Sequence, residues 1–360
     1  MPPVDREDIQ ITFDPNGPGR EGLLFGMPYT PEQADIVIMP VPWEVTVSYS
    51  AGTADGPEAV LKASAQVDLY LHGVWEPWKL PIAMLPVSLP LKRENDNYRD
   101  LAAAYIRWIE KEGTIENAPE MKVVPRAINE ISEKLNIHTM LTAKEYLDKG
   151  KIVGLLGGDH STPLGLLRAL AKKYKSFGIL QIDAHADLRI AYENFIYSHA
   201  SIMYNALKLP QVSRLVQVGI RDICDQEVKY IEKSEGRIKT FFDEDIQESL
   251  FEGTHWKDIT GEIINHLPEH VYISFDIDGL DPQLCPNTGT PVPGGLSFNQ
   301  AVYLIKAVVA SGRKIIGFDL SEVGTGDTDW DANVGSRLLF HLCCWTAVSQ
   351  KMLKAASRQF

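Results

Sequence analysis

Short apolar runs alternate with helical patterns along the second half of the chain. Five runs rich in Ile, Val, Leu and Phe predict buried strands at residues 151–156, 177–182, 215–220, 271–275 and 314–320. A further run, at residues 36–39, predicts a strand nearer the N-terminus. Alternation of buried strands and helices is typical of a mostly parallel sheet with helices on both faces. We therefore expect an α/β fold, in which a single domain of three layers, αβα, is built around a mostly parallel central sheet.

The regions outside this alternation are less regular. Residues 1–33 hold many Pro and Gly residues and lack a strong period, so we expect an extended N-terminal arm before a main domain at residues 34–360. Residues 80–136 carry several prolines and an amphipathic helical pattern at residues 98–112. This stretch is interpreted as an insertion or a peripheral layer on the main domain.

The composition limits the kind of partner that the chain binds. Apolar residues make up 44% and charged residues 23%, which is ordinary for a globular protein. The formal net charge of −13 disfavours nucleic acid and anionic membranes and suits a cationic ligand. The four cysteines form no Cys-x-x-Cys pair, which indicates buried thiols in a reducing compartment. Because there is neither a signal peptide nor an apolar span long enough to cross a bilayer, we expect a cytoplasmic protein with no membrane partner.

Side chains that could bind metal gather at the ends of three predicted strands. They are His160 in the first cluster, Asp183, His185 and Asp187 in the second, and Asp276 and Asp278 in the third. The carboxyl ends of parallel strands lie at one edge of a sheet, where ligands bind. Burying unpaired charge there costs on the order of several kcal/mol. Two divalent cations would neutralise this charge, and a two-metal site can turn water into hydroxide near neutral pH.

The donor types narrow the choice of ion. Asp183, His185 and Asp187 alternate along the chain, so an extended segment would place their side chains on one side. Nitrogen and oxygen donors together suit Mn²⁺, Fe²⁺, Ni²⁺ or Zn²⁺ better than Ca²⁺ or Mg²⁺. Asp276 and Asp278 would repel each other unless a cation lay between them. Any one cluster alone could be a turn with a capping carboxylate, but three of them at strand ends favour a metal site.

The segments that hold these clusters resemble the three signatures of the ureohydrolases, the superfamily that includes arginase and agmatinase. They read Gly-Gly-Asp-His-Ser at 157–161, Asp-Ala-His-Ala-Asp at 183–187 and Ser-Phe-Asp-Ile-Asp-Gly-Leu-Asp-Pro at 274–282. Residues 289–296 resemble the loop that follows the third signature, and residues 319–323 resemble the strand that carries the substrate glutamate. The resemblance spans residues 34–350, except for the insertion around residues 80–136, and it implies an arginase-like fold.

The resemblance implies a site for two divalent metal ions, with Mn²⁺ as the first expectation and Ni²⁺ as the alternative. One ion would take His160 and Asp187, the other would take His185 and Asp278, and Asp183 and Asp276 would bridge the two. Water activated between the ions would attack the carbon of a guanidinium group. The implied products are urea and an amine or ammonia.

Two further residues receive roles from the same resemblance. Glu322 matches the glutamate that holds the guanidinium group through paired hydrogen bonds. His199, within Tyr-Ser-His-Ala at 197–200, matches a histidine that relays a proton near the leaving amine. The alternative for His199 is a purely structural role in its loop.

The substrate is less closely defined than the reaction. Residues 188–193 do not match the segment with which arginase holds the carboxylate of its amino acid, whereas residues 183–189 and 198–201 resemble the agmatinase branch. We therefore expect a small cationic guanidinium substrate of the agmatine type, sensed by the loops around Arg189 and Trp330, with free guanidine as the alternative. A non-catalytic regulatory homologue is a further alternative, but the complete set of ligand-type residues argues against it. The family resemblance also implies a homo-trimer or a homo-hexamer.

Overall fold

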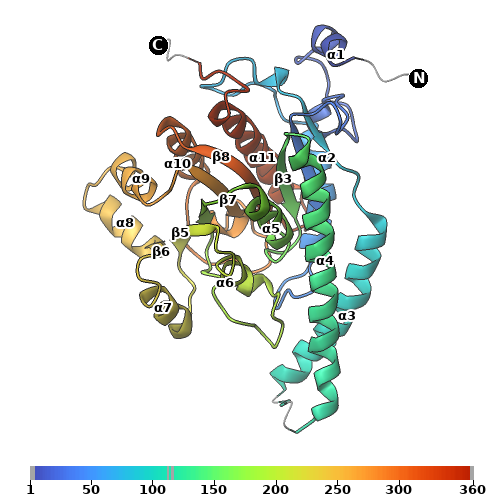
Figure 1. Ribbon diagram of the computed structural model, residues 1–360, viewed down its shortest axis with the longest axis vertical. Coiled ribbons are helices and arrows are strands. Elements are labelled where there is room, and N and C mark those ends of the chain that lie inside the picture. Colours follow the sequence, from blue (N-terminus) through green and yellow to red (C-terminus); the bar gives the residue numbers. More distant parts are fainter. Residues whose placement is uncertain (1–4, 112, 115–116, 357–360) are drawn as a thin grey trace.

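A parallel β-sheet forms the centre of the molecule (Figure 1). The computed structural model describes residues 5–111, 113–114 and 117–356. The strands, given in chain order, are β1 (Ile36–Val41), β2 (Ile82–Met84), β3 (Ile152–Gly157), β4 (Phe177–Ile182), β5 (Val212–Ile220), β6 (Ile238–Phe242), β7 (His270–Asp276) and β8 (Lys314–Ser321). Among the described residues the sheet has eight strands in the order β2-β1-β3-β8-β7-β4-β5-β6, and all neighbours are parallel. The predicted α/β fold is confirmed.

Helices cover the sheet in two groups. The helices are α1 (Arg6–Thr12), α2 (Gly56–Ser64), α3 (Leu89–Glu110), α4 (Val123–Asp148), α5 (Leu164–Lys173), α6 (Ile202–Ala206), α7 (Asp225–Glu232), α8 (Asp243–Phe251), α9 (Trp256–Asn265), α10 (Phe298–Ala310) and α11 (Trp330–Ser349). One group packs α11 against α2, α10 and β8, and the other packs α4 against α5 and α3. The strands between the two groups are apolar and mostly buried, in agreement with the six apolar runs that predict buried strands.

The region around residues 80–136 is more regular than its prolines suggest. It contains β2, α3 and the first half of α4, and Figure 1 shows α3 and α4 as two long helices running side by side along one flank of the molecule. Helix α3 begins nine residues before the predicted start at residue 98, because the Ser88 side chain accepts a hydrogen bond from Leu91 N and Pro90 lies in the first turn. The pattern did not predict β2, which has only three residues, or the partly exposed strand β6.

The N-terminal segment differs from the extended arm that its composition predicts. Residues 6–12 form α1, and Ile9 on this helix is buried. Leu24 and Phe25 also join the core, where the Phe25 ring meets the Phe340 ring of α11 edge-on at 5.0 Å. The segment is therefore packed on its own domain in the described residues 5–33. The boundary at residue 33 stays a prediction, and residues 1–4 lie outside the described part.

Two predictions from composition can be compared with the structure. Cys285, Cys343 and Cys344 are buried free thiols, as expected, whereas the free thiol of Cys224 is partly exposed. Across the described residues, no helix combines the length and the apolar character needed to cross a membrane.

Candidate metal centre and active site

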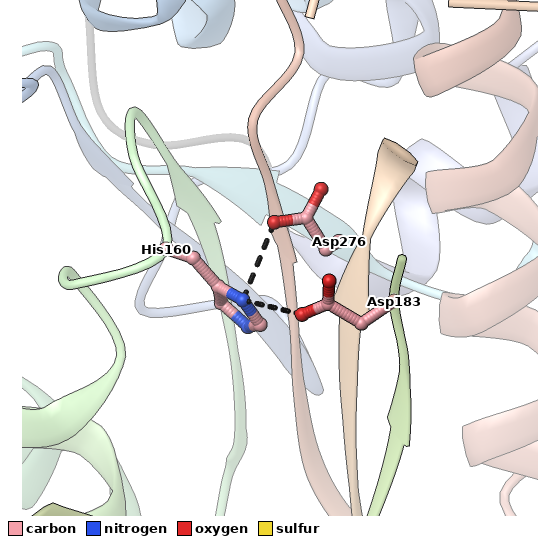
Figure 2. Close-up of side chains that lie close together, drawn as sticks. All are labelled: His160, Asp183 and Asp276. Carbon is pink, nitrogen blue, oxygen red and sulfur yellow. Dashed lines mark ion pairs between the residues drawn. The ribbon is translucent and has the colours of Figure 1, made fainter. Parts of the chain in front are cut away.

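The three predicted clusters meet at the carboxyl edge of the sheet. His160 follows β3 by three residues, Asp183 follows β4 directly, and Asp276 is the last residue of β7. Figure 2 shows the three side chains pointing toward one another. Nδ1 of His160 lies 3.0 Å from Oδ2 of Asp183 and 3.3 Å from Oδ2 of Asp276. Parallel strands thus place residues more than 100 positions apart in one buried group with the spacing of metal ligands.

A second group shares a member with the first. Asp183, His185 and Asp278 also have ligand atoms close enough to hold an ion, so Asp183 belongs to both groups. Nδ1 of His185 lies 3.1 Å from Oδ2 of Asp278. Asp187 completes the predicted set, because its Oδ2 lies 2.9 Å from Nδ1 of His160. The structure therefore brings all six predicted residues together.

Backbone contacts fix the directions of these carboxylates. Asp278 accepts a hydrogen bond from Ala184 N at 3.0 Å, and its own N–H donates to Oδ1 of Asp276 at 2.9 Å. Asp187 has a φ of 55°, a left-handed conformation that is costly for a residue with a side chain. Each of Asp276 and Asp278 thus holds one oxygen by a backbone N–H and turns the other toward a histidine.

The site passes a test of whether it suits a cation. Among the described residues, His160 Nδ1 and Asp278 Oδ2 are buried without a hydrogen-bond partner, although oppositely charged groups surround them. Burial and the neighbouring Asp278 raise the pKa of the Asp276 carboxyl well above its ordinary value. Burial and the nearby Asp183 raise the pKa of Asp187 to about 7. Crowded carboxylates and imidazoles with unused lone pairs are a donor set that fits divalent transition ions.

A buried hydrogen-bonded chain supports the far side of the His160 ring. Nε2 of His160 lies 2.9 Å from Oγ of Ser274, and Ser274 Oγ donates to Oδ2 of Asp319 at 2.8 Å. A proton on Nε2 would leave Nδ1 free as a ligand, and this is how outer residues orient metal-binding histidines. Neither Ser274 nor Asp319 is among the predicted site residues. Their signal in the sequence is a polar residue inside an otherwise apolar strand.

Glu322 lies beside the cluster in a strained and buried conformation. It follows β8 with a φ of 62°, and its Oε1 accepts a hydrogen bond from His160 N at 2.9 Å. Its Oε2 is buried and unpartnered among the described residues. A Cβ atom on Gly289 would lie 2.7 Å from this oxygen, so glycine keeps the space beside it open. An unpaired carboxylate oxygen facing such a space fits a cationic hydrogen-bond donor.

His199 lies in a short 3₁₀ turn, His199–Ser201, near the first cluster. Its backbone N–H donates to Oγ1 of Thr46 at 3.2 Å, and Thr46 donates in turn to Oδ2 of Asp159 at 3.2 Å. Burial and the charge of His185 lower the pKa of His199 to about 3. The imidazole is therefore neutral at pH 7 and keeps a lone pair on one ring nitrogen.

The two residues expected to sense the substrate tail are both engaged in other contacts. The Arg189 guanidinium lies 4.8 Å over the Tyr192 ring, and its Nε is 3.9 Å from Oε2 of Glu227. The Trp330 indole is partly exposed at the start of α11, where its Nε1 donates to Gln283 O at 2.9 Å. Their proposed role in selectivity stays a prediction.

Comparison with known proteins agrees with the site. The model of the arginase family matches residues 34–344. The chain is 33% identical to an N(1)-aminopropylagmatine ureohydrolase of Thermus thermophilus over 89% of this chain and 93% of that protein, and 30% identical to an agmatinase of Neisseria meningitidis over 82% and 81%. The agmatine ureohydrolase structure of Thermoplasma volcanium has a TM-score of 0.69 at 21% identity, covering 96% and 99% of the two chains, which indicates the same fold. The family that the three motifs predict is therefore confirmed: this chain belongs to the arginase family of ureohydrolases.

Proposed function

We propose that this chain hydrolyses the guanidinium group of a small cationic compound to urea and an amine, with an agmatine-type substrate as the first candidate. The observation that carries the proposal is the unpaired Oε2 of Glu322 beside a largely buried group of six side chains that could bind metal. The activities named for the relatives from Thermus thermophilus and Neisseria meningitidis support the same reaction class.

In this proposal the residues of the two overlapping groups and Asp187 would hold two divalent ions, with Mn²⁺ as the first expectation and Ni²⁺ as the alternative. Asp183, which belongs to both groups, would bridge the two ions together with Asp276. Burial opposes its ionisation, but the close imidazoles of His160 and His185 lower the pKa of Asp183 below its ordinary value, so it is a carboxylate at neutral pH. Ions bound there would supply a water nucleophile near neutral pH.

Glu322 would bind and orient the substrate. Its Oε1 is fixed by His160 N, so its free Oε2 has a defined direction toward the space that Gly289 leaves open. A guanidinium N–H that donates to Oε2 would hold the reacting carbon next to the metal ligands. Because the oxygen is buried, water does not compete for this charge-assisted hydrogen bond, and the orientation is correspondingly strict.

His199 would move the proton that the leaving amine requires. Its neutral imidazole can accept a proton when the nucleophile adds and can donate it to the departing nitrogen. The backbone hydrogen bond to Thr46 and the ring of Tyr192, which lies edge-on at 6.2 Å, restrict its position. The structural alternative for His199 makes a different prediction, since it would leave the rate unchanged when the imidazole is removed.

A urea-release screen tests the proposal. Metal-free protein loaded separately with Mn²⁺ and Ni²⁺ would be offered agmatine, guanidinobutyrate, free guanidine and arginine. Agmatine or guanidine should give the highest kcat/KM, and arginine the lowest, because its carboxylate and ammonium need partners of their own. Guanidine is included because the cationic Arg189 stacks on Tyr192, which contacts His199, and a positive charge there disfavours a cationic tail. Urea release from none of the four would contradict the proposal.

We also propose that the chain assembles as a homo-trimer or homo-hexamer, as the family resemblance implies. Light scattering during size-exclusion chromatography measures the molar mass directly. The expected result is three or six times the chain mass of 40.2 kDa. A mass equal to that of one chain would contradict this part of the proposal.

A further inference from the structure

Helix α4 contacts the segment that leads from the metal cluster to His199. The side chain of Asn129 on α4 donates from Nδ2 to Asn194 O at 3.2 Å and accepts at Oδ1 from Ile196 N at 2.7 Å. One side-chain amide therefore pairs with a backbone carbonyl and a backbone N–H two residues apart. This is the pairing that a neighbouring strand would offer, and it fixes the direction of the chain three residues before His199.

Helix α3 holds the same segment from the other helix of the insertion. Nδ2 of Asn194 donates to the hydroxyl of Tyr105 at 3.0 Å. The Tyr105 ring is buried and lies 5.7 Å from the ring of Phe195. Both α3 and α4 therefore make contacts that hold residues 194–196. These two helices lie largely within residues 80–136, the region that the family resemblance does not include.

The backbone of the turn at residues 192–196 has an unfavourable conformation that other contacts must stabilise. Glu193 and Asn194 have φ values of 52° and 66°, both in the left-handed region. Two consecutive residues with side chains in this region cost free energy that the rest of the structure must offset. Hydrogen bonds between Tyr192 and Phe195, at 2.7 and 3.1 Å, close the turn.

The turn places an aromatic ring against His199. The Tyr192 ring meets the His199 ring edge-on, with an interplanar angle of 87°. Two other contacts also hold this stretch, the hydrogen bond from His199 N to Thr46 and that from Nδ2 of Asn205 to Ile196 O at 2.8 Å. Loss of the contacts from α3 and α4 should therefore shift the position of His199, while these two other contacts still restrain it.

We propose that the α3–α4 insertion is a positioning device for His199, acting through Asn129 and Tyr105 on the turn at residues 192–196. The proposal rests on the proton-relay role of His199 under the proposed function. Asn129 is a positioning residue in this scheme, since it contacts the turn and neither substrate nor metal ligands.

The location of Asn129 makes the proposal testable without damage to the core. A surface groove of about 750 Å³ runs between α4 and the turn, and Asn129, Glu133, Asn194, Ile196 and Tyr197 are among the residues that line it. The two hydrogen bonds of Asn129 are solvent-exposed. An Asn129→Ala variant should therefore fold and keep its metal content.

The first experiment compares Asn129→Ala and Tyr105→Phe with the unaltered enzyme. Arg126→Ala is the matched control, because Arg126 is an exposed residue on the same helix whose side chain pairs with Glu130 on that helix. Both test variants should lower kcat by roughly tenfold while KM and bound metal stay within about twofold, because a displaced acid–base group loses part of its usual contribution. An unchanged kcat in Asn129→Ala would overturn the proposal.

The second experiment separates the effect of the Asn129 contacts from proton transfer by His199. In a His199→Ala background, Asn129→Ala should cause no further loss of kcat, because the group through which it acts is gone. An equal loss in both backgrounds would overturn the positioning role while leaving the proposed function intact. A His199→Ala enzyme with unchanged kcat would instead contradict the relay under the proposed function, and with it the basis of the positioning role.

Discussion

The metal cluster and the turn at residues 192–196, which contacts His199, lie close together but are held in different ways. The cluster is fixed by strand register, since β7 and β8 pair Ser274 with Asp319 and Asp276 with Ser321. Its side chains are buried except for that of His185, which is 22% exposed. The turn at residues 192–196 is instead fixed by side chains that bond to its backbone at the surface, above all Asn129.

Because of this difference, the metal cluster and the turn should respond differently to mutation. A change in strand register would move every ligand on that strand to the other face, so the cluster either forms as a whole or fails as a whole. Surface hydrogen bonds are each worth about 0.5–1.5 kcal/mol and can change one at a time. Single changes in the turn should therefore alter the rate of this chain without loss of its metal site.

The largest effect should come from Asp183, the residue shared by both ligand groups. Asp183→Ala should remove a bridging carboxylate and leave the remaining charges facing one another, so we expect loss of both metals and of detectable turnover. Elemental analysis and urea release measure the two outcomes. Asp225→Ala, which removes an exposed carboxylate on α7, should change neither. Activity of the Asp183 variant within tenfold of the unaltered enzyme would contradict the bridging role.

The next largest effect tests the turn rather than the cluster. His199→Ala should lower kcat by about 10²–10⁴-fold, the usual contribution of general acid–base catalysis, because the leaving amine would lack its proton donor. Metal content should stay the same, since His199 belongs to neither ligand group. Steady-state kinetics with metal analysis on one preparation decide between this expectation and a purely structural histidine.

The region that the sequence predicts well is the one built from strands. Buried parallel strands are short apolar runs, and residues within three positions of their carboxyl ends, such as Asp183 and His160, are brought to the same edge. Fold class and the convergence of the six ligand residues could therefore be inferred from local pattern. Ser274 and Asp319 could not, because a strand's sequence does not specify which residue stands beside it in the sheet.

The contacts between the turn and helices α3 and α4 could not be predicted from local sequence pattern, for a related reason. The function of Asn129 depends on two backbone groups more than 60 residues away, and nothing in the sequence of α4 distinguishes it from an ordinary exposed asparagine. Similarly, the sequence pattern includes Leu24 and Phe25 in a Pro- and Gly-rich arm, although both are buried in the core and Phe25 packs against Phe340 of α11. Long-range contacts decide both cases, and hydrophobic periodicity carries no information about them.

A smaller effect on metal binding is expected from Ser274, which contacts the far side of the His160 ring. Ser274→Ala should break the link between His160 and Asp319 and weaken metal binding by about 10–100-fold, as outer-residue changes commonly do. Competition with a chelator measures this affinity. Ser213→Ala is a suitable control, because Ser213 is a strand serine whose hydroxyl bonds to Phe177 O. Equal affinity in the two variants would contradict a supporting role for Ser274 and would confine the metal centre to its direct ligands.

The smallest effect concerns the stability of the turn and depends on pH. Burial and the carboxylate of Glu110 raise the pKa of Glu193 from 4.5 to about 7. The folded state therefore holds this proton more tightly than the unfolded state, so the resulting stabilisation is complete below pH 4.5 and is lost as the pH rises through about 7. Glu193→Gln cannot ionise. It should match the unaltered protein at pH 4.5 and exceed its free energy of unfolding by about 1–2 kcal/mol at pH 8, after allowance for partial exposure.

Denaturant unfolding of metal-free protein at the two pH values measures this difference. Glu235→Gln is the matched control, because Glu235 is an exposed glutamate that also has a positive φ, of 51°. It should alter stability little at either pH. A Glu193→Gln variant that is no more stable than the unaltered protein at pH 8 would mean that the carboxylate is well solvated. The contacts of the turn, including those with Asn129 and Tyr105, would then act without opposition from a buried charge. The effect of the turn on His199 should in that case be independent of pH between 5 and 8.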